Sequence, residues 1–105
     1  MDSIVSNRTD LLQRLSEHGP EIRTFGVSHL GLFGSFARDS KIDKESDVDF
    51  LVDFEQGKKT YDNFFDLSFF LEALLGRKVE IVTRQSLSKY IGPHILKEVQ
   101  HVPLP

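Results

Sequence analysis

Apolar and polar residues alternate from Val48 to Phe54, which is the period-two pattern of a β-strand with one buried face. Apolar runs at positions 27–33 and 77–83 predict two further strands. The three runs are short and bounded by glycine or charged residues, as strands usually are. They predict a small mixed sheet of about three strands.

Apolar residues also recur at helical spacing in longer segments. Helices are predicted at 4–17 and 61–75. The second lies between Thr60, which can cap its first turn, and Gly76, which is a typical C-terminal stop. Gly92-Pro93 opens a further helix. The sequence therefore alternates between strand and helix patterns.

This order of elements predicts an α/β fold with the helices packed on one side of the sheet. A length of 105 residues suits one domain, and we assign residues 1–105 to it. The opposite sheet face is expected to stay open to solvent. The tail from Val102 onward is expected to be loose.

Two carboxylates share the polar face of the strand at 48–54. Asp47 and Asp49 are two residues apart, so their side chains point the same way and lie roughly 6–7 Å apart. Like charges at that distance are unfavourable without a counter-charge, and Mg²⁺ with its oxygen ligands can supply one. A solvated strand face is the alternative explanation of an Asp-x-Asp pair. Asp53 lies further along the same face, and we interpret it as structural.

A second polar feature follows the strand at 27–33. Gly34 permits a tight turn, Ser35 can cap a short helix, and Arg38 lies about one turn later. Exposed amides and a guanidinium at such a turn predict a phosphate-binding site. The alternative is an ordinary strand–turn–helix with a surface arginine, and the two common glycine-rich phosphate loops are absent from the sequence. Together with the carboxylates, the turn predicts a site for a nucleoside triphosphate with Mg²⁺.

The combination of Gly34-Ser35, a loop, and Asp47-Val48-Asp49 resembles the signature of the DNA polymerase β-type nucleotidyltransferase superfamily. Its small prokaryotic members, the minimal nucleotidyltransferases, are the most similar, and the likeness extends over roughly residues 30–96. The stretches Phe36-Ala37-Arg38 and Ser46 to Val52 are similar to theirs almost residue for residue. Eleven residues separate Ser35 from Asp47, where the family has ten.

The resemblance implies a third carboxylate on a neighbouring strand, and Glu80 occupies that position, where the family more often has Asp. It implies that Glu80 helps to bind one or two Mg²⁺ and to deprotonate an acceptor hydroxyl. The residues that would bind metal are Asp47, Asp49 and Glu80, and those that would hold the phosphates of ATP are Gly34, Ser35 and Arg38.

In the most similar relatives, the resemblance implies an antitoxin that transfers AMP from ATP to a tyrosine hydroxyl of a small helical HEPN toxin. Two alternatives of different classes stay open. One is a transferase subunit that modifies a small molecule together with a helical partner. The other is a non-catalytic antitoxin that neutralises its partner by contact, through the surplus phenylalanines Phe65, Phe69 and Phe70.

Composition narrows the function classes only in part. The net charge is −3, with 13 basic and 16 acidic residues, so the chain lacks the basic footprint of a nucleic-acid binder. It has no cysteine, which excludes disulfides and thiolate zinc sites. No long apolar span or signal segment is visible, so a cytoplasmic location without a membrane partner is expected.

Overall fold

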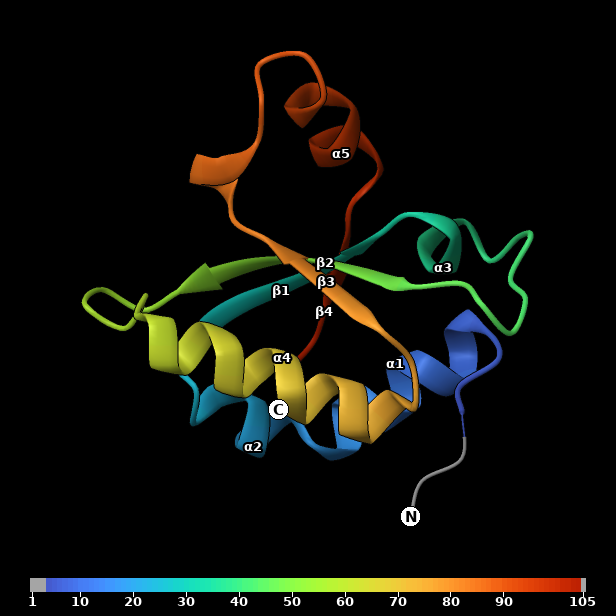
Figure 1. The fold of residues 1–105 in the computed structure, drawn as a ribbon, viewed down its shortest axis with the longest axis horizontal. Coiled ribbons are helices and arrows are strands. Elements are labelled where there is room, and N and C mark those ends of the chain that lie inside the picture. Colours follow the sequence, from blue (N-terminus) through green and yellow to red (C-terminus); the bar gives the residue numbers. More distant parts are fainter. Residues whose placement is uncertain (1–3, 105) are drawn as a thin grey trace.

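The computed structural model describes residues 4–104. Strands and helices alternate along most of this length, as Figure 1 shows. The elements in chain order are α1 (Arg8–Glu17), α2 (Gly19–Arg23), β1 (Val27–Phe33), α3 (Ser35–Arg38), β2 (Val48–Phe54), α4 (Tyr61–Leu75), β3 (Val79–Val82), the 3-10 turn η1 (Arg84–Ser86), α5 (Gly92–Glu98) and β4 (Gln100–Val102).

The sheet has four strands in the order β3-β2-β1-β4 and is mixed. Strand β1 runs antiparallel to both β2 and β4, whereas β2 and β3 are parallel. The mixed α/β fold predicted from the sequence is confirmed, but the sheet has one strand more than expected. Strand β4 pairs with only three residues of β1, Leu30 to Leu32, so its sequence is too short to carry a recognisable alternation.

The tail that was expected to be loose is held against the body. Val102 is buried, and the Leu104 carbonyl accepts hydrogen bonds from Arg23 Nε at 3.3 Å and Nη2 at 2.9 Å. An arginine fork on a single carbonyl fixes both the position and the direction of a chain end. The prediction for the tail was therefore wrong in its first three residues.

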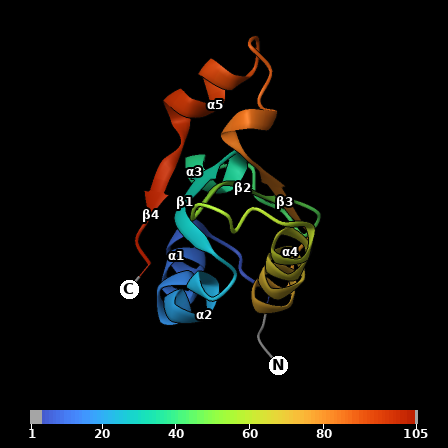
Figure 2. The ribbon, with the colours of Figure 1, turned by 90° about the vertical axis from the view of Figure 1, so that its left-hand side faces the viewer.

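Helices α1, α2 and α4 cover one face of the sheet, whereas α5 stands on the other side (Figure 2). The prediction of helices on one side thus holds for the three helices that build the core and not for α5. The core between these layers contains Leu11, Leu15, Ile22, Leu30, Leu32, Phe36, Phe50, Val52, Leu67, Leu71 and Leu75, all fully buried. The other face carries the polar residues of β2.

Helix α4 forms where its start and stop signals predict it. The Thr60 hydroxyl accepts a hydrogen bond from the Asn63 amide at 3.1 Å, and the helix ends at Gly76 with φ 69°. Its surplus phenylalanines do not form one surface, because Phe70 packs against Phe25 at 5.4 Å between ring centroids. Phe65 and Phe69 remain 48% and 65% exposed.

A short second helix, α2, follows α1, although Gly19-Pro20 indicates the end of a helix in the sequence. It can form because proline is well tolerated in a first helical turn. In the described part of the chain, no helix combines the length and the apolar character that a bilayer crossing requires.

Candidate active site

The pairing of β2 with β3 brings two of the predicted carboxylates together. Asp49 and Glu80 are direct partners in the parallel register, so both side chains point to the face opposite the core. Asp47 lies two residues before Asp49, in the loop directly before the first residue of β2. Glu80 and Asp47 are exposed, whereas Asp49 is half-buried. All three are therefore reachable from the open side of the sheet.

The electrostatics of this cluster centre on Asp49. Partial burial raises the pKa of Asp49 most, the nearby charges of Glu80 and Asp47 raise it in the same direction, and the net result is a pKa of about 6 instead of the usual 3.8. Arg38 acts the other way and lowers the pKa, while Glu98 adds to the rise. Beside the effect of burial, three carboxylates raise the pKa of Asp49 and one guanidinium lowers it, so the charges around this carboxyl are mainly negative.

Next to the carboxylates, β1 ends in a turn that only glycine can make. Gly34 has φ 79° and ψ −158°, a region that side chains exclude. A Cβ atom on Gly34 would also collide with the carboxylate of Asp49. The turn predicted from Gly34 is thus present, and it lies directly against the carboxylate side of β2.

Ser35 does not have the capping role that the sequence suggested. Gly34 is the N-cap of α3, no side chain caps this helix, and Ser35 is its first helical residue. The cap prediction was wrong because the glycine already provides the sharp change of direction. Arg38, in the last turn of α3, is largely exposed and extends from the same turn.

Glu98, for which the sequence carries no signal, occupies this turn. The amide of Gly34 donates to Glu98 Oε1 at 3.0 Å, and Arg38 Nη1 donates to both oxygens of Glu98 at 3.2 Å. Glu98 is the last residue of α5 and lies 64 positions from Gly34 along the chain. No local pattern could have indicated this contact, because a glutamate at a helix end is ordinarily solvated.

Asp53 has a partner of its own. Its carboxylate accepts from Arg84 Nε at 3.1 and 3.3 Å, and it lies across from His29 in the β1–β2 register. The arginine neutralises Asp53, which lies four residues beyond Asp49 on the same face. The interpretation of Asp53 as structural agrees with this pairing.

A buried arginine fixes the loop that leads into Asp47. Arg77 donates from Nη1 to the carbonyls of Asp43 at 2.7 Å and Ser46 at 2.8 Å. Its Nε donates to the Val5 carbonyl at 2.6 Å, and its guanidinium lies 5.0 Å from the centre of the Phe36 ring. Arg77 therefore ties the loop before β2 to α3 and to the N-terminal segment.

Across the described residues, no three acidic, histidine or cysteine side chains already converge as a metal site. The chemistry of the donor set nonetheless fits a hard divalent cation, since Asp49 and Glu80 share a face and their charges repel each other. The residues that could bind it are Asp47, Asp49 and Glu80.

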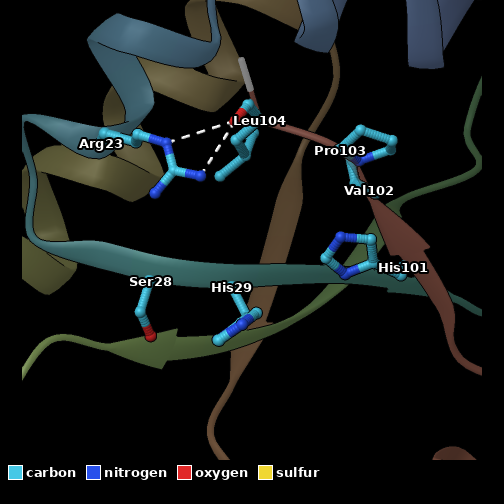
Figure 3. Close-up of a pocket in the computed structure, with 7 residues that line it drawn as sticks. All are labelled: Arg23, Ser28, His29, His101, Val102, Pro103 and Leu104. Atoms are coloured by element: carbon cyan, nitrogen blue, oxygen red, sulfur yellow. Dashed lines mark hydrogen bonds between the residues drawn. The ribbon is translucent and has the colours of Figure 1, made fainter.

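Two hollows lie elsewhere on the molecule and contain none of these carboxylates. Figure 3 shows a hollow of about 280 Å³ between β1 and the C-terminal tail, where His29 and His101 face each other at 6.1 Å between ring centroids. A second, of about 180 Å³, shares both histidines and is also lined by Asp53 and Arg84.

Comparison with known proteins agrees with the geometry of the site. The family described as "Nucleotidyltransferase domain" matches residues 9–102. Protein adenylyltransferase MntA of Thermococcus cleftensis is 43% identical over 89 residues, which is 84% of this chain and 88% of the relative.

Two solved structures share the architecture. One, described as a minimal nucleotidyltransferase, superposes with a TM-score of 0.67 at 31% identity over 89% of this chain and 95% of the other. The second, described as a toxin-antitoxin with AMP-PNP, gives a TM-score of 0.63 at 18% identity over 94% of this chain and 74% of the other. At that identity the second likeness shows the fold alone.

Proposed function

This chain belongs to the nucleotidyltransferase domain family, and from that premise we propose that it transfers AMP from ATP to a tyrosine hydroxyl of a helical HEPN-type toxin, for which it serves as antitoxin. The observation that carries the proposal is the pairing of Asp49 with Glu80 directly beside the Gly34 turn. The high identity with a protein adenylyltransferase supports a protein as the acceptor.

The phosphates of ATP would be held at the end of β1. The Gly34 amide and the Arg38 guanidinium both point to one position, where they now hold a carboxylate, so the same donors can hold phosphate oxygens. Ser35 follows in the same turn and offers its amide and hydroxyl. Because Gly34 lies against the carboxylate of Asp49, phosphates held at this turn would lie beside the residues that would bind Mg²⁺.

Asp47, Asp49 and Glu80 would hold Mg²⁺, which when bound neutralises phosphate charge and favours displacement at the α-phosphorus. Their shared face and mutual repulsion are the features of the chain that fit this role. Asp49, as the half-buried member beside Gly34, anchors the set to the phosphate turn.

The transfer itself is a single displacement. The tyrosine oxygen forms a bond to the α-phosphorus as the bond from that phosphorus to the β-bridging oxygen breaks, and pyrophosphate leaves. The phenol proton goes to Glu80, which is exposed and lies at the side open to a protein acceptor, and from there to solvent. Positioning of the two reactants supplies a large part of the acceleration in such transfers.

One observation favours a second candidate, an antitoxin that acts by contact. Tyr61, Phe65 and Phe69 lie along the outer side of α4 and are 82%, 48% and 65% exposed. Tyr61 and Phe65 stack at 5.9 Å between ring centroids. An exposed aromatic row of this kind is typical of a protein contact.

The decisive experiment incubates the chain with ATP, Mg²⁺ and the product of the neighbouring gene, tested as the toxin, and then measures the intact mass of that product. We expect a gain of one AMP, mapped to a tyrosine, that is lost in Asp49→Asn and strongly reduced in Glu80→Gln. Asp53→Asn is the matched control, because Asp53 lies on the same strand and face but is paired with Arg84.

Binding without any mass gain would reject the transferase function. In that case Phe65→Ser with Phe69→Ser should abolish neutralisation, whereas the carboxylate variants should leave it intact. A mass gain on a small molecule instead of the protein would point to the transferase subunit with a different acceptor.

A further inference from the structure

Glu98 occupies the two groups that the proposed function assigns to phosphate. Its Oε1 accepts from the Gly34 amide at 3.0 Å, and both of its oxygens accept from Arg38 Nη1 at 3.2 Å. A carboxylate held by a backbone amide and a guanidinium has the charge and the acceptor geometry of a phosphate edge. We propose that Glu98 is an internal competitor of the nucleotide: its carboxylate fills the phosphate position, and it leaves when Mg²⁺–triphosphate binds.

The inference rests on the proposed function, because it supposes that a triphosphate binds at this turn. Gly34 is the point of conflict. A backbone amide has one hydrogen, so it cannot serve the Glu98 oxygen and a phosphate oxygen with full strength at once. A phosphate placed beside Glu98 would also meet a like charge at contact distance. Binding at Gly34 therefore requires that the Glu98 carboxylate move.

The contact is weak enough to be displaced. The side chains of Arg38 and Glu98 are 56% and 36% exposed, so solvent screens their attraction. The hydrogen bond from the Gly34 amide to Glu98 adds to this attraction, but it is only half-buried. An ion pair of this kind weakens the binding of a triphosphate at this turn without preventing it.

Helix α5 has few packing contacts that would prevent Glu98 from moving away from Gly34. Gly92 is its only buried residue, Leu96 is 43% exposed, and the helix stands apart from the core layers on the open side of the sheet (Figure 2). Directly after Glu98 the backbone becomes extended at Val99, which joins the helix to β4. Few packing contacts must break for α5 to shift, so occupation of the nucleotide site is coupled to the position of this helix.

The first test compares three forms of the whole chain by calorimetric titration with Mg²⁺–ATP and with Mg²⁺–inorganic triphosphate, which has no base. The forms are wild type, Glu98→Gln and the control Glu55→Gln, which removes the same charge from an exposed loop position. We expect Glu98→Gln to lower the dissociation constant for both ligands by about two- to fivefold, the range of a screened ion pair. Glu55→Gln should match wild type.

Equal or weaker binding by Glu98→Gln, with wild type and control still binding, would overturn the competitor role and leave the proposed function standing. If neither wild type nor Glu98→Gln binds Mg²⁺–ATP, the proposed function fails and the inference fails with it. The two results are thus distinguishable in one titration series.

The second test needs no substitution and separates displacement from simple charge repulsion. Hydrogen exchange of the wild-type chain is measured with and without Mg²⁺–triphosphate. We expect slower exchange at 34–38, where the phosphates bind, and faster exchange at 92–98, where the Glu98 anchor is released. Unchanged or slower exchange at 92–98 on ligand binding would contradict the displacement, even if Glu98→Gln binds more tightly.

Discussion

Substituting Asp49 by Asn should make the protein more stable while removing its activity. The pKa of Asp49 is raised to about 6 from 3.8, chiefly by burial and then by Glu80 and Asp47. The folded chain therefore binds the Asp49 proton more tightly than the unfolded chain does. The contribution of this bound proton to the stability of the fold is complete below pH 3.8 and is lost as the pH rises through about 6. At neutral pH the charged carboxylate destabilises the fold, and Asn removes that charge with almost the same shape.

The size of the effect follows from the pKa difference. A rise of about two pKa units corresponds to about 3 kcal/mol of free energy for a fully buried group. Asp49 is only half-buried, so solvent screening reduces the expected gain to about 1–1.5 kcal/mol. For a domain of this length, that gain raises the melting temperature by about 4–8 °C.

Thermal unfolding followed by circular dichroism, in EDTA, provides the assay. The difference in the free energy of unfolding between Asp49→Asn and wild type should reach about 1–1.5 kcal/mol at pH 7.5 and should nearly vanish toward pH 4. Addition of Mg²⁺ should narrow the gap by stabilising wild type alone. Asp53→Asn, which loses the pairing with Arg84, should show no stabilisation at either pH. A variant that is no more stable than wild type at pH 7.5, or a gap independent of pH, would refute the reasoning.

Three further substitutions test the turn, the buried arginine and the open face. Gly34→Ala should lower the free energy of unfolding, measured in urea, by about 2–3 kcal/mol and should abolish nucleotide binding. The backbone at this position excludes side chains, and the new Cβ would collide with Asp49. A variant of normal stability would contradict the turn geometry. Arg77→Met should cost about 3 kcal/mol by leaving three backbone carbonyls without their donor, and a loss below about 1 kcal/mol would mean that water replaces it. Arg84→Ala should change the free energy of unfolding by less than about 0.5 kcal/mol, because solvent reaches both side chains of its pair with Asp53 and screens their attraction. A larger loss would show that solvent does not screen this pair.

The parts of the fold that the sequence predicted are those set by local chemistry. Strand β2 follows from an alternation that only Leu51 interrupts, and α4 follows from the Thr60 cap, apolar residues at helical spacing and Gly76. Strand β4 could not be predicted in this way, because its three residues become a strand only through pairing with β1. The same holds for Phe70, whose burial depends on Phe25 from a distant segment.

In the candidate site, too, the features set by local sequence could be predicted and those set by distant contacts could not. The Gly34 turn and the Asp-x-Asp strand are local patterns, and their adjacency follows from the antiparallel pairing of β1 with β2. The pairing of Asp49 with Glu80 depends on the parallel register of β2 and β3, which no spacing rule could supply. The resemblance to a known family suggested only that Glu80 lies on a neighbouring strand. Glu98 was missed because its position depends on where α5 returns to the sheet.

The two halves of the site are in different electrostatic states, and this has a consequence for the order of binding. The phosphate half is satisfied from within the chain, since Glu98 accepts from both Gly34 and Arg38. The carboxylate half is not, because within residues 4–104 no lysine or arginine forms an ion pair with Asp49 or Glu80. A cation therefore relieves existing repulsion on arrival, whereas a triphosphate must first displace a partner. We expect a divalent cation alone to stabilise the free chain, and free triphosphate without a cation to bind weakly in wild type and more tightly only when Glu98 is neutral.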